Sequence, residues 1–255
     1  MLFERVKNSI QFRYKSYRYN RFCDGVARPE FDYGDLTAQG YYSQCGQDKW
    51  LLENLFRDQQ SGTFVDIGAH DGVSFSNTYR MEQVGWQGLA IEPMPEAFEK
   101  LQNNRSCITV NGCVSDSERS AKFRLITGYS QMLSGLVEEY DERHLQRIDR
   151  ELEIHGGSRR DIDVECFRLD RLCGDHNFAE IDFLNLDVEG AELTVLKSID
   201  FSALTIRVIA VENNYADYRI PSLLSKFGFS LHSIAGDEIY VNSNSFTHKN
   251  RPLAS

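Results

Sequence analysis

The stretch TFVDIGAHDG, residues 63–72, decides the fold of this chain. Its first five residues are mostly β-branched or aromatic and predict a short buried strand. Gly68 and Gly72 then allow a tight turn and a close approach of the backbone to a neighbour. We expect a helix over residues 74–84, so that a ligand can lie against the backbone N–H groups at the helix start. The stretch therefore predicts a nucleotide-type pocket, with an ordinary strand-to-helix turn as the alternative.

The next apolar run, GLAIE at residues 88–92, ends in a carboxylate. In a doubly wound sheet, an acidic residue that ends the second strand lies beside the ligand ribose and accepts hydrogen bonds from its hydroxyls. Glu92 comes twenty residues after Gly72, which is the spacing of such an acidic residue, and we predict that it binds a ribose. Pro95 then starts an amphipathic helix, PEAFEKLQNN.

Three further apolar runs predict strands that end in polar residues: 107–114, 181–187 and 205–212. Ser115 and Asp116 follow the first run and suit either the edge of an adenine ring or a side-chain-to-backbone turn. Residues 228–243, GFSLHSIAGDEIYVNS, predict a hairpin that closes one edge of the sheet. The pattern indicates an α/β fold with a mostly parallel sheet.

The carboxylates after residues 181–187 are the first candidates for chemistry. Asp187 ends this strand, and Glu189 follows near the start of the next helix. Because ligands bind outside the carboxyl ends of strands in open α/β sheets, both should face the pocket that Gly68 and Glu92 open. A structural role for Glu189 at the positive end of a helix dipole is the alternative.

The charged segment over about residues 128–157 predicts a helical insertion that ends at paired glycines. Acidic and basic residues at i,i+4 spacing are typical of an exposed helix. A helix inserted beside the strand ends is also a common lid over a substrate site. His144 lies in this segment, and because histidine has a pKa suited to proton transfer it is a candidate general base.

Charge and length predict one domain preceded by a basic arm. The 255-residue chain has a formal net charge of −10, which argues against nucleic acid as a partner because phosphate binding needs clustered Lys and Arg. Residues 1–22 are the exception, with basic and aromatic side chains interleaved, and they suit peripheral contact with an anionic membrane, a cover over the domain or a solvated terminus. We expect an arm and linker over residues 1–40 and the domain over residues 41–255. Because the sequence contains neither a secretory signal nor a membrane span, we expect a cytoplasmic protein that can associate with a membrane.

Several of these motifs together resemble the FkbM-type methyltransferases, which use S-adenosylmethionine. The resemblance covers about residues 41–243 and is carried by SQCGQD at 43–48, FVDIGAHDG at 64–72, IEPMPE at 91–96, VSD at 114–116 and IDFLNLDVEGAELTVLKS at 181–198. It implies the Rossmann-like class I methyltransferase fold, a three-layer α/β sandwich whose seven-stranded, mostly parallel sheet has an antiparallel last strand. One departure is His70, because the family usually carries Asn at this place in the turn.

The resemblance also implies roles for residues at matching positions. It places the methionine part of the cofactor at Asp66, Gly68 and Gly72, the ribose at Glu92, and the adenine near Ser115 and Asp116. It places Asp187 near the transferred methyl group.

The reaction that the resemblance implies is an in-line displacement in which a hydroxyl oxygen attacks the methyl group of a sulfonium ion. Positioning and desolvation supply much of the rate, and a neutral hydroxyl also needs a general base. Asp187 is the first candidate for this base, followed by Glu189 and His144. The expected acceptor is a small-molecule, glycan or lipid-linked hydroxyl, on a sugar, a glycolipid or a natural product.

Three alternatives stay open. Mg²⁺ held by Asp187, Glu212 and Asn213 would lower the pKa of the acceptor hydroxyl, but nothing in the sequence requires it, and we expect no metal ion. A nicotinamide-dependent oxidoreductase has a similar turn, although residues 68–72 lack the full G-x-G-x-x-G pattern. A non-catalytic nucleotide-binding protein could have the same fold.

Overall fold

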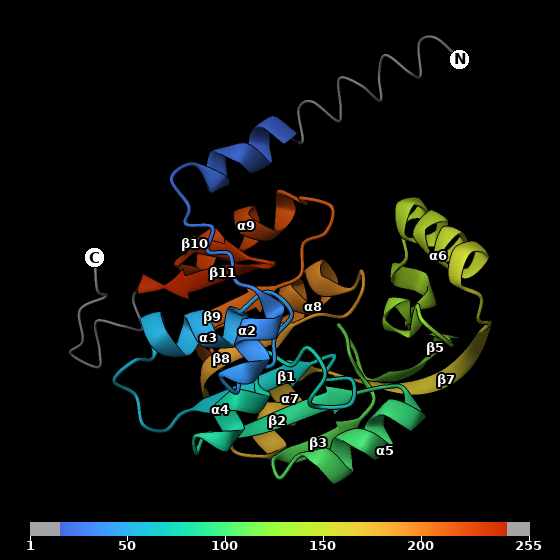
Figure 1. The fold of residues 1–255 in the computed structure, drawn as a ribbon, viewed down its shortest axis with the longest axis horizontal. Coiled ribbons are helices and arrows are strands. Elements are labelled where there is room, and N and C mark those ends of the chain that lie inside the picture. Colours follow the sequence, from blue (N-terminus) through green and yellow to red (C-terminus); the bar gives the residue numbers. More distant parts are fainter. Residues whose placement is uncertain (1–15, 244–255) are drawn as a thin grey trace.

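Two β-sheets organise the described part of the chain, residues 16–243 of a computed structural model (Figure 1). The larger sheet has seven strands in the order β10-β11-β9-β8-β1-β2-β3. Its strands are β1 (Thr63–Ile67), β2 (Gln87–Glu92), β3 (Ile108–Asn111), β8 (Glu180–Leu186), β9 (Thr205–Val211), β10 (Phe229–Ala235) and β11 (Asp237–Asn242). Neighbouring strands from β9 to β3 are parallel, whereas β11 is antiparallel to both β9 and β10. The predicted mostly parallel sheet with an antiparallel last strand is confirmed.

Helices cover both faces of this sheet because its central strands are apolar on both sides. One face carries α7 (Leu169–Asp175), α8 (Glu192–Ser198), α9 (Arg219–Leu224) and the short η4 (Ser225–Phe227). The other face carries α3 (Gln47–Trp50), the π-helical turn η1 (Leu51–Leu55), α4 (Tyr79–Gln83) and α5 (Pro95–Asn104). In β1, Val65 packs on the first face and Phe64 on the second, as the period of two in a strand requires. The result is a three-layer sandwich.

The helix predicted over residues 74–84 is shorter than expected. Only α4 is helical, because one carboxylate oxygen of Asp71 accepts the N–H groups of Val73 (2.9 Å) and Ser74 (2.7 Å) and holds an irregular turn. Phe75 has a φ of 58°, which a right-handed helix does not allow. The glycine turn is therefore followed by a loop, and the expectation of a helix start beside the ligand is wrong.

The smaller sheet has four strands in the order β4-β7-β5-β6. They are β4 (Cys113–Val114), β5 (Arg119–Ile126), β6 (Gly135–Leu136) and β7 (Arg159–Phe167). The chain passes from β3 into β4 through Gly112, whose φ is 155° and where a Cβ would lie 2.6 Å from the carbonyl oxygen of Glu165. The strand predicted over residues 107–114 is thus divided between two sheets.

The segment 128–157 lies between β5 and β7 and is helical only in part. It contains η2 (Gln131–Leu133), β6, η3 (Val137–Glu139) and α6 (Glu142–His155). Asp141 caps α6 by accepting the N–H groups of Arg143 (2.8 Å) and His144 (3.0 Å). Ile148 packs against Ile126 and Leu133. Figure 1 shows α6 to one side of the central sheet, beyond β5 and β7.

The chain before the central sheet packs partly on its edge. Residues 16–23 are helical and precede α2 (Tyr33–Ala38). The Tyr19 hydroxyl donates to Glu238 of β11, and the Arg18 guanidinium lies 4.5 Å from the centre of the Tyr218 ring. This part of the basic arm covers the domain, whereas the membrane contact predicted for residues 1–22 falls largely on residues 1–15, outside the described residues. Among residues 16–243, no helix is both long and apolar enough to cross a membrane.

The ends of β1, β2 and β8 are joined by backbone contacts at Gly68. The N–H groups of Gly68 and Ala69 both donate to the carbonyl oxygen of Ile91 at 3.0 Å, and the N–H of Asp187 donates to Ile67 at 3.1 Å. Gly68 has a φ of 89°, and a Cβ there would lie 1.8 Å from the carbonyl oxygen of Asp187. Only glycine allows this approach.

Gly68→Ala should therefore destabilise the fold strongly. The added methyl group must displace the end of β1 or of β8, and we expect a loss of at least about 3 kcal/mol in the free energy of unfolding. The matched control is Gly25→Ala, because Gly25 also has a positive φ (72°) but a Cβ there meets nothing within 4 Å. The control should lose only about 1 to 2 kcal/mol. Urea denaturation measures both, and equal losses would contradict the role given to the contact with Asp187.

Candidate active site

A cavity opens at the carboxyl ends of β1, β2 and β8, and we call it the main cavity. The strand ends contribute Gly68, Glu92 and Asp187 to its wall, and the smaller sheet contributes Phe123 and Leu136. Its volume is about 260 Å³. The predicted convergence of strand-end residues on one pocket is present in the structure.

Glu92 ends β2 as a buried carboxyl group in the wall of the main cavity. One of its oxygens accepts the N–H of His70 at 2.8 Å, and the other accepts the N–H of Met94 at 2.7 Å. Burial raises the pKa of Glu92 to about 7, although both backbone hydrogen bonds act in the opposite direction. Each oxygen keeps a free lone pair for a further donor.

Asp66 and Gly72 lie on either side of the turn at Gly68 and contact the elements that support it. Asp66 is buried and accepts hydrogen bonds from Thr78 Oγ1 (2.5 Å) and Asn185 Nδ2 (2.9 Å). Gly72 is not among the residues that line the main cavity, and a Cβ there would lie 2.6 Å from Leu101 and 2.7 Å from Arg105. Asp66 reaches the cavity wall, whereas Gly72 permits the packing of α5.

The predicted adenine contacts, Ser115 and Asp116, lie just beyond the main cavity. The cavity wall includes Cys113 and Val114 but not the two residues that follow. Ser115 is buried, and its N–H donates to the carbonyl oxygen of Phe167 at 2.9 Å, while Asp116 is exposed. Their role at an adenine ring stays a prediction.

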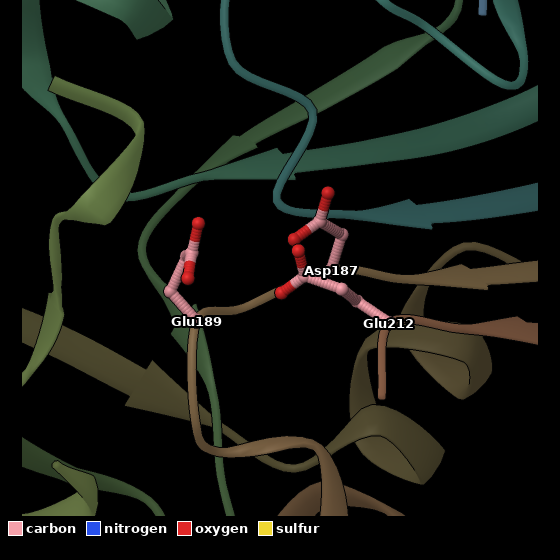
Figure 2. Close-up of side chains that lie close together, drawn as sticks. All are labelled: Asp187, Glu189 and Glu212. Carbon is pink, nitrogen blue, oxygen red and sulfur yellow. The ribbon is translucent and has the colours of Figure 1, made fainter. Parts of the chain in front are cut away.

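Three carboxyl groups gather at the ends of β8 and β9, and we call Asp187, Glu189 and Glu212 the acidic cluster (Figure 2). One oxygen from each side chain lies within 4.8 Å of the others. Burial raises the pKa of all three groups. Repulsion from Glu212 adds to this effect at Asp187 and Glu189, and repulsion from Glu192 and Asp237 adds to it at Glu212. The pKa of Glu212 reaches about 7. The cluster therefore holds protons and negative charge together near neutral pH.

His144 lies next to the acidic cluster but does not line the main cavity. Its Nδ1 is 3.7 Å from Glu189 Oε2, and its Nε2 is 3.3 Å from the carbonyl oxygen of Leu133. Burial lowers its pKa, which favours the neutral ring. A ring that donates from Nε2 to Leu133 presents the lone pair of Nδ1 to Glu189, which suits a carboxyl group that keeps its proton. This geometry fits a residue that holds Glu189 in place, and catalysis by His144 itself stays a prediction.

Asn213 does not join the acidic cluster. Its side-chain amide donates to Glu238 at 2.8 Å and faces the carbonyl oxygen of Asp217 at 3.4 Å. Glu189 instead completes the group of three oxygen ligands that could hold a metal ion. The structure thus brings Glu189 to Asp187 and Glu212, and a metal role for Asn213 stays a prediction.

The sequence reasoning missed three polar residues that line the main cavity, Asn77, Asn185 and Asp237. Asn77 donates to Asn185 at 2.8 Å and to Asp237 at 3.0 Å, and Gln47 also donates to Asp237 at 2.8 Å. Asn185 was detectable as the one amide inside the apolar run IDFLNLD. Asp237 was not, because an aspartate after a glycine is typical of any hairpin turn.

Arg147 of α6 was missed as well. It lines the main cavity, and its Nη1 lies 3.7 Å from Glu189 Oε2. In the sequence it is one of many charged residues in the insertion, and spacing alone does not distinguish it from its exposed neighbours. The fold brings this cation to the edge of the acidic cluster.

The strand order, the glycine turn and the acidic strand ends define a class I, Rossmann-like methyltransferase fold. The family model for the methyltransferase FkbM domain matches residues 66–233, and the chain belongs to this family. The protein is accordingly an S-adenosylmethionine-dependent methyltransferase, as the sequence motifs predicted.

Solved structures with similarity to this chain include two methyltransferases. The METTL16 MTase domain is 11% identical, with 84% of this chain and 70% of that chain covered and a TM-score of 0.43. A TehB-like SAM-dependent methyltransferase from Corynebacterium glutamicum is 12% identical, with 82% of this chain and 91% of that chain covered and a TM-score of 0.37. No curated protein sequence matches the chain.

The residues of the main cavity fit S-adenosylmethionine. The two oxygens of Glu92 can accept from both ribose hydroxyls, and Met94 and Val114 offer apolar surface for a purine nearby. The acidic cluster supplies negative charge for a sulfonium ion.

Binding of S-adenosylhomocysteine should weaken as the pH falls below about 7. Glu92 must be ionised to accept from both ribose hydroxyls, and below its raised pKa each pH unit costs up to about tenfold in affinity. Isothermal titration calorimetry over a pH series measures this slope. Glu92→Gln should bind at least about tenfold more weakly and lose the slope, whereas Glu96→Gln, an exposed carboxyl change nearby, should behave like the wild type. An affinity of the wild type that is constant with pH would contradict the assignment of Glu92 to the ribose.

Proposed function

We propose that this protein transfers the methyl group of S-adenosylmethionine to a hydroxyl oxygen of a sugar, a glycolipid or a natural product. The observation that carries the proposal is the acidic cluster, which lies in the main cavity beside the turn at Gly68. Transfer to a hydroxyl needs a base next to the attacking oxygen. Among residues 16–243, neither Asp187 nor Glu212 forms an ion pair that would remove it from this task.

Bound S-adenosylmethionine supplies an electrophilic methyl group on a positively charged sulfur. The carboxyl groups of the cluster share their charge, because ionising one of them raises the pKa of its neighbours. The ionised member takes the hydroxyl proton as the acceptor oxygen attacks. Asp187 is the first candidate for this base, since its backbone lies directly against Gly68 at the turn.

The other groups of the site support this base. Glu189 lies between His144 and Arg147, at 3.7 Å from each, and this pair fixes its position. Phe123 and Leu136 add apolar surface to the wall of the main cavity, and in this proposal they keep water from the reacting groups. The proton from the acceptor can then spread over the cluster rather than stay on a single buried carboxyl group.

Asp187→Asn should lower kcat by about 10² to 10⁴. Asparagine keeps the shape of the side chain but cannot take the proton, so the affinity for S-adenosylhomocysteine should change by only a few fold. Formation of S-adenosylhomocysteine with a panel of hydroxylated acceptors gives kcat, and mass spectrometry identifies the methylated product. The matched control is Glu180→Gln at the opposite, exposed end of β8, which should leave kcat unchanged.

Two results would contradict this proposal. Loss of activity in a chelator with recovery in Mg²⁺ would transfer the role of the cluster from base to metal ligand; we expect activity to persist, because Arg147 already lies beside the cluster. Thermal stabilisation by NAD and not by S-adenosylmethionine would contradict O-methylation altogether.

The preference for S-adenosylmethionine over S-adenosylhomocysteine should grow as the pH rises through about 7. A sulfonium ion lowers the raised pKa values of the cluster, so its binding releases protons, whereas the uncharged sulfur of the product does not. Both ligands carry the ribose, and the ratio of their dissociation constants therefore cancels the contribution of Glu92. We expect this ratio to change by up to about tenfold per pH unit. Glu212→Gln should flatten the dependence, and a ratio that is constant in the wild type would show that the cluster does not face the sulfur.

A further inference from the structure

The hairpin of β10 and β11 brings to the main cavity a carboxylate that the proposed methyl transfer does not use. Asp237 begins β11 and lines this cavity. It follows Gly236, which has a φ of 73° and where a Cβ would lie 2.9 Å from Cys45 Sγ and 3.0 Å from Gln47 Nε2. Glycine thus lets the hairpin turn approach the start of α3, and Asp237 comes within hydrogen-bonding distance of Gln47.

Two amide side chains fix one oxygen of the Asp237 carboxylate. Its Oδ2 accepts from Gln47 Nε2 at 2.8 Å and from Asn77 Nδ2 at 3.0 Å. Asn77 also donates to Asn185 at 2.8 Å, and Asn185 donates to Asp66 at 2.9 Å. Because the Asn77 amide bonds both Asp237 and β8, it holds the carboxylate in one orientation.

The other oxygen of Asp237, Oδ1, is left for a ligand. It has no hydrogen-bond partner within residues 16–243, and it does not belong to the buried polar atoms that lack one. Oδ1 is therefore accessible, and the side chain forms part of the wall of the main cavity. Because a carboxylate oxygen is only an acceptor, the group that completes it must be a donor.

The charges around Asp237 favour a cationic donor. Burial raises the pKa of Asp237, although the hydrogen bonds from Gln47 and Asn77 act in the opposite direction. In the part of the chain from residue 16 to residue 243, no Lys, Arg or His forms an ion pair with it. A cation at Oδ1 would stabilise the ionised carboxylate.

Asp237 lies on the side of the main cavity that the methionine chain of the cofactor would occupy. Met94 and Val114 offer surface for the purine on one side of Glu92, at the ends of β2 and β4. A ribose on Glu92 then leaves the methionine chain to extend the other way, across the end of β1 toward β8 and β9. Since β11 is antiparallel to β9, its first residue, Asp237, lies at this same edge of the sheet.

Asp66, where the resemblance places the methionine part, has less room for a charged group. Its side chain is buried and accepts the Thr78 hydroxyl on one oxygen and the Asn185 amide on the other. The accessible oxygen of Asp237 has no such occupant.

We propose that Asp237 is a cofactor-binding residue whose Oδ1 holds the α-ammonium group of S-adenosylmethionine. Gln47 and Asn77 keep the carboxylate in the orientation that this contact needs. The ammonium group has three donors and a positive charge, so it satisfies both the accessible oxygen and the charge of the carboxylate. The contact fixes the chain that carries the sulfur and so helps to direct the methyl group. This role does not depend on the chemical nature of the methyl acceptor.

Asp237→Asn tests the contact in the full chain, with ligands that differ only at the amino-acid end. S-adenosylhomocysteine and the 3-aminopropyl thioether of 5′-thioadenosine carry the ammonium group, whereas the 3-carboxypropyl thioether and 5′-methylthioadenosine lack it. Asparagine keeps an oxygen for Gln47 and Asn77 but loses the charge. Isothermal titration calorimetry should therefore show at least about tenfold weaker binding of the two ammonium ligands, the worth of a hydrogen bond between charged groups.

The two ligands without the ammonium group should bind Asp237→Asn at least as tightly as the wild type. Unchanged binding of 5′-methylthioadenosine also shows that the variant is folded. In the wild type, the aminopropyl compound should bind at least about tenfold more tightly than the carboxypropyl compound, and this comparison needs no variant.

Two control variants separate this contact from other effects. Asp58→Asn is the same change at an exposed aspartate outside the main cavity, and it should leave all four affinities unchanged. Glu92→Gln should weaken all four ligands alike, because all of them carry the ribose.

Three results would overturn the inference: an equal loss for all four ligands in Asp237→Asn, unchanged affinities for the ammonium ligands in this variant, or a wild type that does not prefer the aminopropyl compound. Wild-type protein that binds neither S-adenosylhomocysteine nor 5′-methylthioadenosine would instead contradict the cofactor on which the proposed function rests.

Discussion

The contact between Gly68 and the backbone of Asp187 is the constraint on which the site depends. A carbonyl oxygen fills the space that any other side chain at position 68 would need, so the ends of β1 and β8 meet without a gap. The paired N–H groups of Gly68 and Ala69 fix the end of β2 at the same level. Because these backbone contacts hold the three strand ends together, Gly68, Glu92 and Asp187 line one cavity.

The second determinant of the site is the cost of burying carboxyl groups. Burial raises the pKa of each member of the acidic cluster, and within residues 16–243 it is Glu189 that lies within ion-pair distance of His144 and Arg147. Such groups destabilise the folded chain as the pH rises above their ordinary pKa values, because the unfolded chain then ionises them more easily. A cationic ligand stabilises the ionised carboxylates when it binds and so offsets this cost. The same electrostatics that cost stability thus favour a sulfonium compound and suit the base that we propose for the reaction.

The local hydrophobic pattern of the sequence was enough to predict the strands that hold the site. Strands β1, β2, β8 and β9 are short apolar runs bounded by polar residues, and both helix layers follow from their two apolar faces. The hydrophobic pattern predicted the wrong element at two places, where a side-chain hydrogen bond or a glycine bend interrupts a regular element. Asp71 holds a loop where helix propensity predicted a helix, and Gly112 sends one apolar run into two sheets. The smaller sheet depends on the pairing of β7 with both β4 and β5, and because β7 is far from them in the chain, local periodicity does not predict these pairings.

The sequence by itself determined the class of the protein, because the glycine turn and the acids that end successive strands are local features at fixed spacing. It also determined that Asp187 and Glu189 stand at a strand end, since a parallel sheet places all such ends on one edge. Only the tertiary structure decided which groups meet there. Glu212 joins Asp187 through the pairing of β8 with β9, and His144 reaches Glu189 through the packing of the insertion. Asp237 meets Gln47 and Asn77 for the same reason: the three come from distant segments, and their approach is set by packing rather than by spacing along the chain.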